Sequence, residues 1–266
     1  MLVRHDGLIW AALALIFEAG LSLILELGLA RSILWAAIRS VLQLSAVGVA
    51  LSWLFQVQNT SLSLGVICLM TFAATHTVLK RIPNRRNSAY NGFSIHVFLS
   101  LAASAWIFSI FAGSLVLTPG SWRKPEVVLP FAGLLLGNSI SGISLGLSQW
   151  VQGLNLEREL IETRLAFGAS SWEAVLPVFR QSLTTAMTPI LNSMTVAGIV
   201  SLPGMMTGQL LAGADPSSAV QYQIAALFLI ASSTFFGVIS ALFFGYRSVF
   251  NFKSQFQRLG LNDQTA

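Results

Sequence analysis

Long apolar runs separated by short polar connections dominate the chain. Because a helix needs about 20 mostly apolar residues to cross the hydrocarbon core of a bilayer, the runs predict about seven membrane-spanning helices. The expected spans are residues 8–28, 33–55, 62–79, 92–117, 127–149, 184–211 and 219–245. The predicted fold class is therefore all-α: a polytopic transmembrane helical bundle forming a single domain over residues 1–266.

Composition supports this interpretation of the pattern. The chain is 55% hydrophobic and 9% charged, with a mean hydropathy of +0.73. A soluble domain carries roughly 25% charged residues. So few charges cannot cover a globular surface, and membrane lipid is therefore the expected solvent. The spans also leave no room for a soluble catalytic domain.

The net charge of +5 does not indicate a nucleic-acid partner, because the basic residues lie in short patches between apolar runs. Basic patches of this kind are typical of cytoplasmic loops of membrane proteins. The densest patch is residues 80–86, which we expect in the cytoplasm. Alternation from there predicts an N-terminus outside and a cytoplasmic tail at residues 246–266. We expect the chain in the inner (plasma) membrane.

Residues 153–183, which we call the elbow, form the most polar connection between two spans. An apolar stripe at roughly helical spacing precedes Gly168, which favours the left-handed backbone that ends helices. The stripe consists of Leu156, Leu160, Leu165 and Phe167. Ser170 and Glu173 have the spacing of a capping box, so a short second helix is expected from about Ser171. The elbow is predicted to be a rigid cytoplasmic protrusion between spans five and six. An amphipathic helix pair lying on the bilayer remains the alternative.

The elbow resembles the cytoplasmic loop of ABC-transporter permeases, whose signature is a Glu-Ala-Ala triplet, three residues and a glycine. Here Glu162-Thr163-Arg164 is followed by Gly168-Ala169-Ser170, so Thr-Arg replaces Ala-Ala. The usual Leu-Pro ending comes slightly early, at Leu176-Pro177. In that family the loop is a coupling helix seated in a cleft of an ATP-binding subunit. The resemblance implies an ATPase-coupling interface at Glu162, Arg164, Gly168, Ala169, Ser170 and Glu173.

A second resemblance extends over most of the chain and is strongest from about residue 130 to 250. Residues 187–213, and Asp215-Pro216 leading into 219–224, are similar to the FetB-type permeases, a group of bacterial iron-export and plant aluminium-tolerance permeases. It implies the membrane subunit of an ABC exporter, working as a homodimer with a separate cytosolic ABC ATPase. The relatives are associated with iron in bacteria and a nucleotide sugar in plants, so the substrate stays open.

The sequence contains no G-x-x-x-x-G-K-[ST] loop, the motif that cradles nucleotide phosphates. ATP and Mg²⁺ are therefore expected on the partner subunit. The chain itself is expected to bind no cofactor and to perform no covalent chemistry.

Ionisable groups inside spans are costly and are treated as functional candidates. Glu18 and Glu26 lie eight residues apart in the first predicted span, which places them on one helix face. Arg39 enters the second span at a depth between them. The predicted Glu–Arg–Glu cluster is either a structural lock or part of a substrate or proton path. If it is a relay, the chain is instead a self-sufficient ion-coupled transporter.

The expected substrate pathway lies between spans five and six, and the first span is a further candidate for its wall. Pro189 and the break at Leu202–Gly204 interrupt the sixth span, and broken helices persist at membrane depth only where they line a cavity or are buried. The pathway candidates are Glu18, Glu26, Arg39, Asn138, Asn192, Met194, Met205 and Met206. The methionines suit soft metal ions but are also ordinary core residues, so no metal ligand is assigned.

Three glycine pairs at four-residue spacing permit close helix packing. They are Gly133/Gly137, Gly142/Gly146 and Gly204/Gly208. Packing within the chain, a dimer interface and a sliding helix are the three interpretations.

Overall fold

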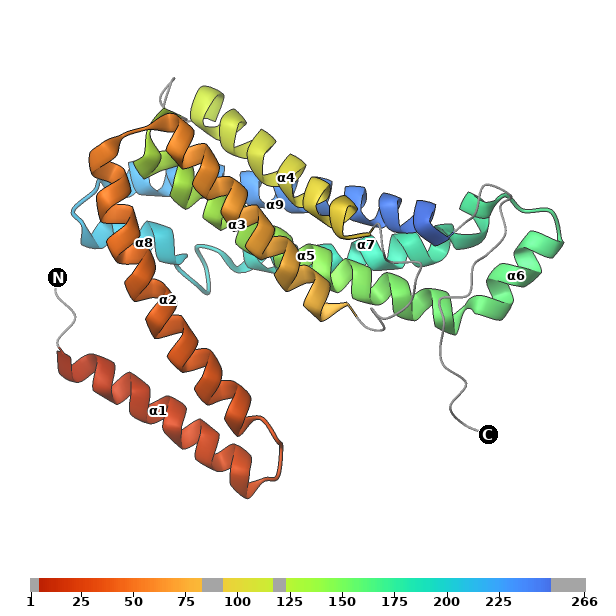
Figure 1. Ribbon diagram of the computed structural model, residues 1–266, viewed down its shortest axis with the longest axis horizontal. Coiled ribbons are helices and arrows are strands. Elements are labelled where there is room, and N and C mark those ends of the chain that lie inside the picture. The colour runs from red at the N-terminus through yellow and green to blue at the C-terminus, as the bar shows by residue number, and fades with distance from the viewer. Residues whose placement is uncertain (1–4, 83–92, 117–122, 250–266) are drawn as a thin grey trace. The chain divides into compact units, whose positions relative to one another are not determined.

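The computed structural model of the chain describes residues 5–82, 93–116 and 123–249. Regular structure in these residues is helical (Figure 1). The elements are α1 (His5–Ile24), α2 (Ala30–Val57), α3 (Thr60–Arg81), α4 (Phe93–Phe111) continued by a π-helical turn (Ala112–Val116), α5 (Pro125–Leu156), α6 (Arg158–Ala166), α7 (Ser171–Val196), α8 (Gly204–Leu211) and α9 (Pro216–Val249).

The predicted all-α membrane bundle is confirmed. Five described helices are long and apolar enough to cross a membrane: α2, α3, residues 94–114 around α4, α5 and α9. In α1 the apolar stretch is shorter, Ile9–Ile24. The total of seven spans stays a prediction. Part of the basic pattern that predicts the orientation lies outside the described residues, namely Arg85, Arg86 and the tail from residue 250.

The sixth span predicted at 184–211 is interrupted, as expected around Leu202–Gly204, but its bounds are wrong. Helix α7 starts earlier, at Ser171, and ends at Val196, where a turn takes over. Gly198 has φ +83° in this turn, and Ala197 bridges Ser201. A separate helix, α8, follows from Gly204. The small residues and Pro203 favour a turn over a helix, although the stretch is apolar enough to resemble a span.

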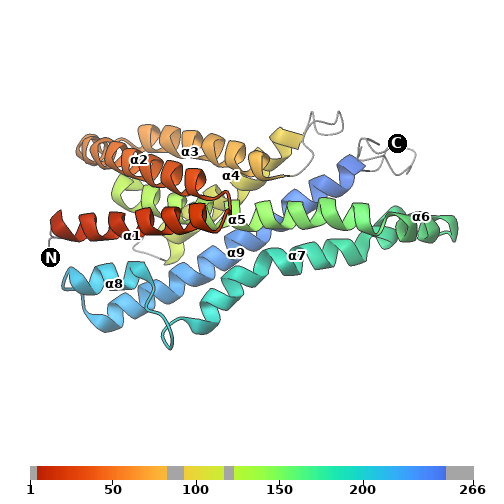
Figure 2. The ribbon, with the colours of Figure 1, turned by 90° about the horizontal axis from the view of Figure 1, so that it is seen from below.

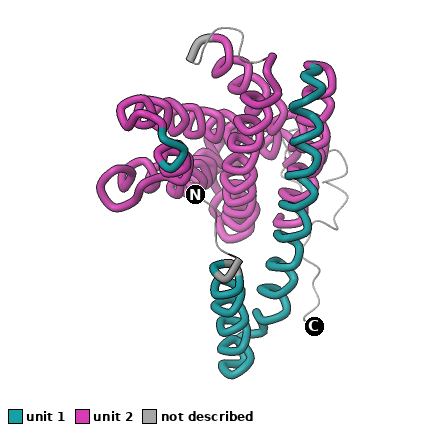
Figure 3. Tube along the Cα trace, turned by 90° about the vertical axis from the view of Figure 1, so that its left-hand side faces the viewer, with its two compact units in different colours: residues 1–59, 211–213 teal, residues 60–210, 214–266 magenta. Residues whose placement is uncertain are grey.

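The structure falls into two compact units (Figure 3). One comprises residues 1–59 with 211–213, and the other comprises residues 60–210 with 214–266. In the first unit α1 packs against α2. The second unit holds the large core, the elbow and the cavity between α5, α7 and α9. The prediction of a single domain is not decided by this division.

Helix α5 is the centre of the second unit, with α3, α4, α7 and α9 packed around it (Figures 1 and 2). Its Leu135, Ile143 and Leu147 are almost completely buried. Two glycines allow the close approach. A Cβ at Gly142 would lie 2.5 Å from Cγ2 of Thr234 in α9, and one at Gly153 would lie 2.6 Å from Cγ1 of Val178 in α7.

The glycine pairs therefore differ in what they do. Gly142 and Gly146 pack against α7 and α9, so the interpretation as packing within the chain is confirmed for this pair. At Gly137, Gly204 and Gly208, an added Cβ would meet no described atom within 4 Å. Those positions do not hold described helices together.

Candidate functional sites

The elbow is a helix, a glycine turn and a second helix, in the order predicted. Helix α6 ends at Ala166, and Gly168 has φ +92°, a conformation that glycine adopts without steric cost. The predicted capping box is present at the start of α7. The Ser170 main-chain N–H donates to Glu173 Oε2 at 2.8 Å, and the Glu173 N–H donates to Ser170 Oγ at 3.3 Å. The second helix is not short, because it continues through Pro177 and Pro189 to Val196.

The carboxylate of Glu173 is stabilised in its charged form. The Ser170 hydroxyl donates to Glu173 Oε2 at 2.7 Å, and the Ser170 main-chain N–H donates to the same oxygen. These two hydrogen bonds, the hydroxyl first, hold the pKa of Glu173 below its ordinary value. The elbow therefore keeps this negative charge at the N-terminus of α7, where the helix dipole also favours it.

Three contacts brace the elbow against the bundle. Arg164 Nη1 donates a 2.9 Å hydrogen bond to the main-chain carbonyl of Ala174, which ties α6 to the first turn of α7. Ile161 is fully buried in the core. The Trp172 ring packs edge-on against Phe179 and against Tyr246 of α9, with ring centroids 5.0 and 5.3 Å apart. The elbow is therefore packed as an extension of α5, α7 and α9.

The outer surface of the elbow is apolar as well as charged. Leu156 is 86% exposed and Phe167 is 88% exposed. Arg158 and Glu162 form an exposed ion pair at 2.8 Å on α6. Of the predicted apolar stripe, Leu156, Leu160 and Phe167 are exposed, whereas Leu165 packs against the core. The chain turns between α5 and α6 at Glu157, so Ile161 is the residue that enters the core.

Four of the predicted coupling residues, Glu162, Arg164, Ser170 and Glu173, make side-chain contacts within the elbow. Arg164 is partly buried on Ala174, and Glu173 is hydrogen-bonded to Ser170. Glu162 and Gly168 are exposed, whereas Ala169 is partly covered. Their contact with an ATPase stays a prediction.

A cavity of about 200 Å³ lies between α5, α7 and α9. It is lined by Asn138, Ser141, Gly142, Ala186, Pro189, Ile190, Ser193 and Thr234. The cavity is where the sequence predicts the pathway, between the fifth span and α7. Asn138 lines it as predicted, and so does Pro189, which was expected to interrupt the helix beside the pathway.

Hydrogen bonding within the helices leaves mainly oxygen acceptors facing this cavity. The Asn138 amide donates to the Leu134 carbonyl at 2.9 Å, and the Ser193 hydroxyl donates to the Pro189 carbonyl at 2.9 Å. Thr234 is 2% exposed, and its hydroxyl has no hydrogen-bond partner among the described residues. Pro189 also lacks the N–H that a helix would offer to the carbonyl four residues earlier. The residues that line the cavity are uncharged, and oxygen atoms are the main polar groups in a lining that is mostly apolar.

Sequence reasoning missed Ser193 and Thr234. Thr234 is the last of three consecutive hydroxyl residues, 232–234, in the otherwise apolar α9. These three polar residues in an apolar run were the signal from which a polar site could have been predicted. The sequence could not show that Thr234 faces the cavity, because this position depends on the close packing of α9 against α5 at Gly142.

The other pathway candidates do not gather at the cavity. Asn192 is exposed on α7, and Met194 packs on the core nearby. Met205 and Met206 lie in α8, beyond the turn, so they do not continue a helix face of α7. The Met206 N–H donates to Gln223 Oε1 at 3.3 Å, which fastens α8 to α9.

The predicted geometry of the Glu–Arg–Glu cluster is wrong. Helix α1 ends at Ile24, and Glu26 lies in the following turn with φ +52°, so it does not share a helix face with Glu18. Glu18, Glu26 and Arg39 are all exposed. In the described part of the first unit, no ion pair joins them. Any role of these three residues in transport stays a prediction.

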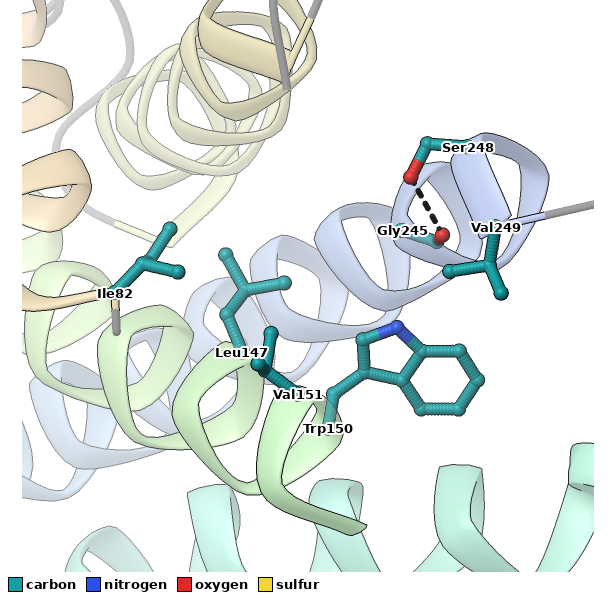
Figure 4. A pocket seen from close by; sticks show the side chains of 7 residues that line it. All are labelled: Ile82, Leu147, Trp150, Val151, Gly245, Ser248 and Val249. Carbon is teal, nitrogen blue, oxygen red and sulfur yellow. Dashed lines mark hydrogen bonds between the residues drawn. The ribbon is translucent and has the colours of Figure 1, made fainter. Parts of the chain in front are cut away.

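A second, smaller cavity lies near the elbow, between α5 and the end of α9 (Figure 4). Its volume is about 10 Å³, roughly the space for a single water molecule. The indole N–H of Trp150 is buried there without a partner among the described residues. The Ser248 hydroxyl donates to the Gly245 carbonyl at 2.8 Å, as Figure 4 shows.

Comparison with known proteins identifies the family of the chain. Residues 6–250 match the family described as "Uncharacterised protein family (UPF0014)". The chain belongs to the UPF0014 family. This UPF0014 chain is 34% identical to the UPF0014 membrane protein slr1647 of Synechocystis over 92% of the chain and 91% of that protein. No solved structure matches it significantly.

Two other relatives carry names that bear on function. The chain is 31% identical to the probable iron export permease protein FetB of Escherichia coli, over 85% of the chain and 84% of that protein. It is 27% identical to the protein ALUMINUM SENSITIVE 3 of Arabidopsis thaliana, over 84% of the chain and 79% of that protein. The resemblance to FetB-type permeases is thereby confirmed for this UPF0014 chain.

Proposed function

We propose that the chain is the membrane-spanning permease subunit of an ATP-driven ABC exporter, with iron or another metal ion as cargo. It works as a homodimer in the inner membrane, with the N-terminus outside and the C-terminus in the cytoplasm. ATP and Mg²⁺ bind to a separate cytosolic ATPase, and this chain carries out no covalent chemistry. The name of the FetB relative supports the metal cargo.

The braced elbow is the observation that carries the proposal. A coupling element has to transmit the motion of its partner and not absorb it. The elbow meets this need because Arg164 and buried Ile161 fix α6 to the bundle while Leu156 and Phe167 remain exposed. Exposed apolar side chains on a rigid support, with charged groups beside them, are typical of a protein-docking surface.

The cavity between α5, α7 and α9 is the proposed waypoint for the cargo. Oxygen atoms are the ligands that hard metal ions prefer. No group of three His, Cys, Asp or Glu residues capable of holding a metal ion occurs in the described ranges. We therefore expect passage through weak contacts with Asn138, Ser193 and Thr234 and not tight binding.

The test is recovery of an ATP-binding partner with the affinity-tagged chain in mild detergent. The informative variant is Phe167→Ser, which removes one of the most exposed apolar side chains of the elbow. Ile199→Ser is the matched control, because Ile199 is also 88% exposed but lies in the turn at the other end of α7. We expect Phe167→Ser to lose the partner and its ATPase activity and Ile199→Ser to keep both. Recovery of the chain without any ATPase, from cells that express it, would refute the proposal.

A further inference from the structure

The outward face of α7 is polar where the neighbouring helices are apolar. Its exposed residues at helical spacing, together the polar face of α7, are Gln181, Thr184, Thr188, Asn192 and Thr195. Leu191 is the main apolar residue beside them. The outward face of α9, by contrast, presents Ile224, Phe228 and Phe236, which is the composition expected next to lipid.

Exposing Asn192 to lipid would cost more free energy than exposing the other residues of this face. Hydroxyl groups in a helix can satisfy themselves, as Thr188 and Thr195 do by donating to the carbonyls four residues earlier, at 2.8 and 2.9 Å. The Asn192 amide makes no hydrogen bond in the part of the chain that the structure describes. An unpaired amide in hydrocarbon costs several kcal/mol on water-to-alkane scales, about 4–8.

Asn192 lies at membrane depth. Ala186 of α7 and Thr234 of α9 both approach Gly142 in the middle of α5. Because α7 and α9 run in opposite directions past α5, Asn192 and Phe228 are at about the same level, six residues beyond Ala186 and six before Thr234. Two exposed side chains at one depth therefore have opposite character, which indicates different surroundings.

We propose that a second copy of this chain covers the polar face of α7, so that α7 packs against its symmetry mate around Asn192. Amide and hydroxyl groups are both donors and acceptors, so this uncharged face is complementary to itself across a two-fold axis. Polar side chains of this type bond across helices in membranes. The face adjoins the cavity through Pro189 and Ser193, so the two cavities of the dimer lie beside the contact.

This inference deepens the proposed function by naming the face through which the homodimer forms. It does not require the ATPase, so it can fail while the partner still co-purifies, and it can hold if no partner is found.

Disulfide cross-linking in native membranes tests the contact. Cys68 is the single cysteine of the chain, so Cys68→Ser gives a cysteine-free background. Asn192→Cys and Thr188→Cys then report on the polar face, and Phe228→Cys is the control at equal depth on α9. After oxidation with copper phenanthroline, we expect a covalent dimer to be at least fivefold more abundant for Asn192→Cys or Thr188→Cys than for Phe228→Cys.

Two positions are used so that one can still report if the other variant fails to fold. Each variant is scored only if the protein is inserted in the membrane and monodisperse after extraction. Equal cross-linking at Phe228→Cys would overturn the inference, as would no covalent dimer at either position on α7. The latter result would mean that another element of the same chain, or water, covers the face. A separate measurement is the dimer dissociation constant in detergent, which we expect Asn192→Leu to raise about three- to thirtyfold.

Discussion

The guanidinium of Arg164 lies 2.9 Å from the main-chain carbonyl oxygen of Ala174, ten residues further along the chain. The bond spans the glycine turn and joins the two helices of the elbow. A positive charge on a carbonyl of the first turn of α7 makes a stronger bond than a neutral donor would. Arg164 therefore stiffens the elbow from the inside, in addition to any contact with a partner.

Removing this bond should loosen the elbow without unfolding the bundle. Arg164→Met keeps much of the aliphatic stem but loses the donors. We expect faster hydrogen exchange at residues 166–171, and partner ATPase activity that responds several-fold less to cargo. Arg158→Met is the control, because the exposed Arg158–Glu162 pair is worth only about 0.3–0.5 kcal/mol. If both variants behave like the wild type, Arg164 is not a brace.

The capping box should make the thermal stability of the elbow depend on pH. The pKa of Glu173 is lowered in the folded protein, so its carboxylate stabilises the fold above the ordinary glutamate pKa of about 4.3. That stabilisation is lost as the pH falls through the lower, folded-state pKa. We expect Glu173→Gln to melt earlier than wild type at pH 7, with the difference shrinking below about pH 4.3. Thermal unfolding from pH 7 to pH 3 measures it, and a difference independent of pH would contradict the role of the charge.

A methyl group added at Gly142 should lower stability, because α5 packs closely against α9 there. Gly142→Ala places a Cβ 2.5 Å from Cγ2 of Thr234, and overpacking of this kind costs about 1–3 kcal/mol. Gly137→Ala in the same helix meets no atom within 4 Å and should be neutral or stabilising by up to about 1 kcal/mol. Thermal unfolding in detergent compares the two variants. A Gly142→Ala protein as stable as Gly137→Ala would show that α5 and α9 do not approach this closely.

Thr234 and Ser233 are neighbours whose substitution should have opposite effects. The Thr234 hydroxyl has no partner among the described residues, so Thr234→Val should leave stability unchanged or higher, while cargo flux falls because the cavity loses a polar contact. Ser233 donates to the Ser104 carbonyl at 3.2 Å, so Ser233→Ala should cost about 1 kcal/mol and leave flux per folded protein unchanged. Unfolding temperature and flux, measured in the same proteoliposomes, separate these outcomes. Equal flux in both variants would remove the cavity from the pathway.

The elements that depend on local chemistry could be predicted from the sequence. Apolar run length located the long helices, and the capping box with Gly168 located the elbow, because both signals act over a few residues. The bounds of the sixth span were wrong because composition alone did not show that the break predicted at Leu202–Gly204 begins already at Ala197. Partners distant in the chain were not predictable. The contact of Arg164 with Ala174 and the cavity wall at Thr234 both depend on how helices pack.

The central claim is that the motion of an ATPase reaches the membrane through the elbow, and Gly168→Pro tests it most directly. Proline fixes φ near −65°, which is incompatible with the φ of +92° at this turn. The measurement is ATP-driven cargo flux in proteoliposomes that hold the chain and its co-purified ATPase. We expect the variant to insert and fold but to lose at least nine-tenths of the flux. Full flux in the variant, or flux driven by an ion gradient without any ATPase, would contradict the account.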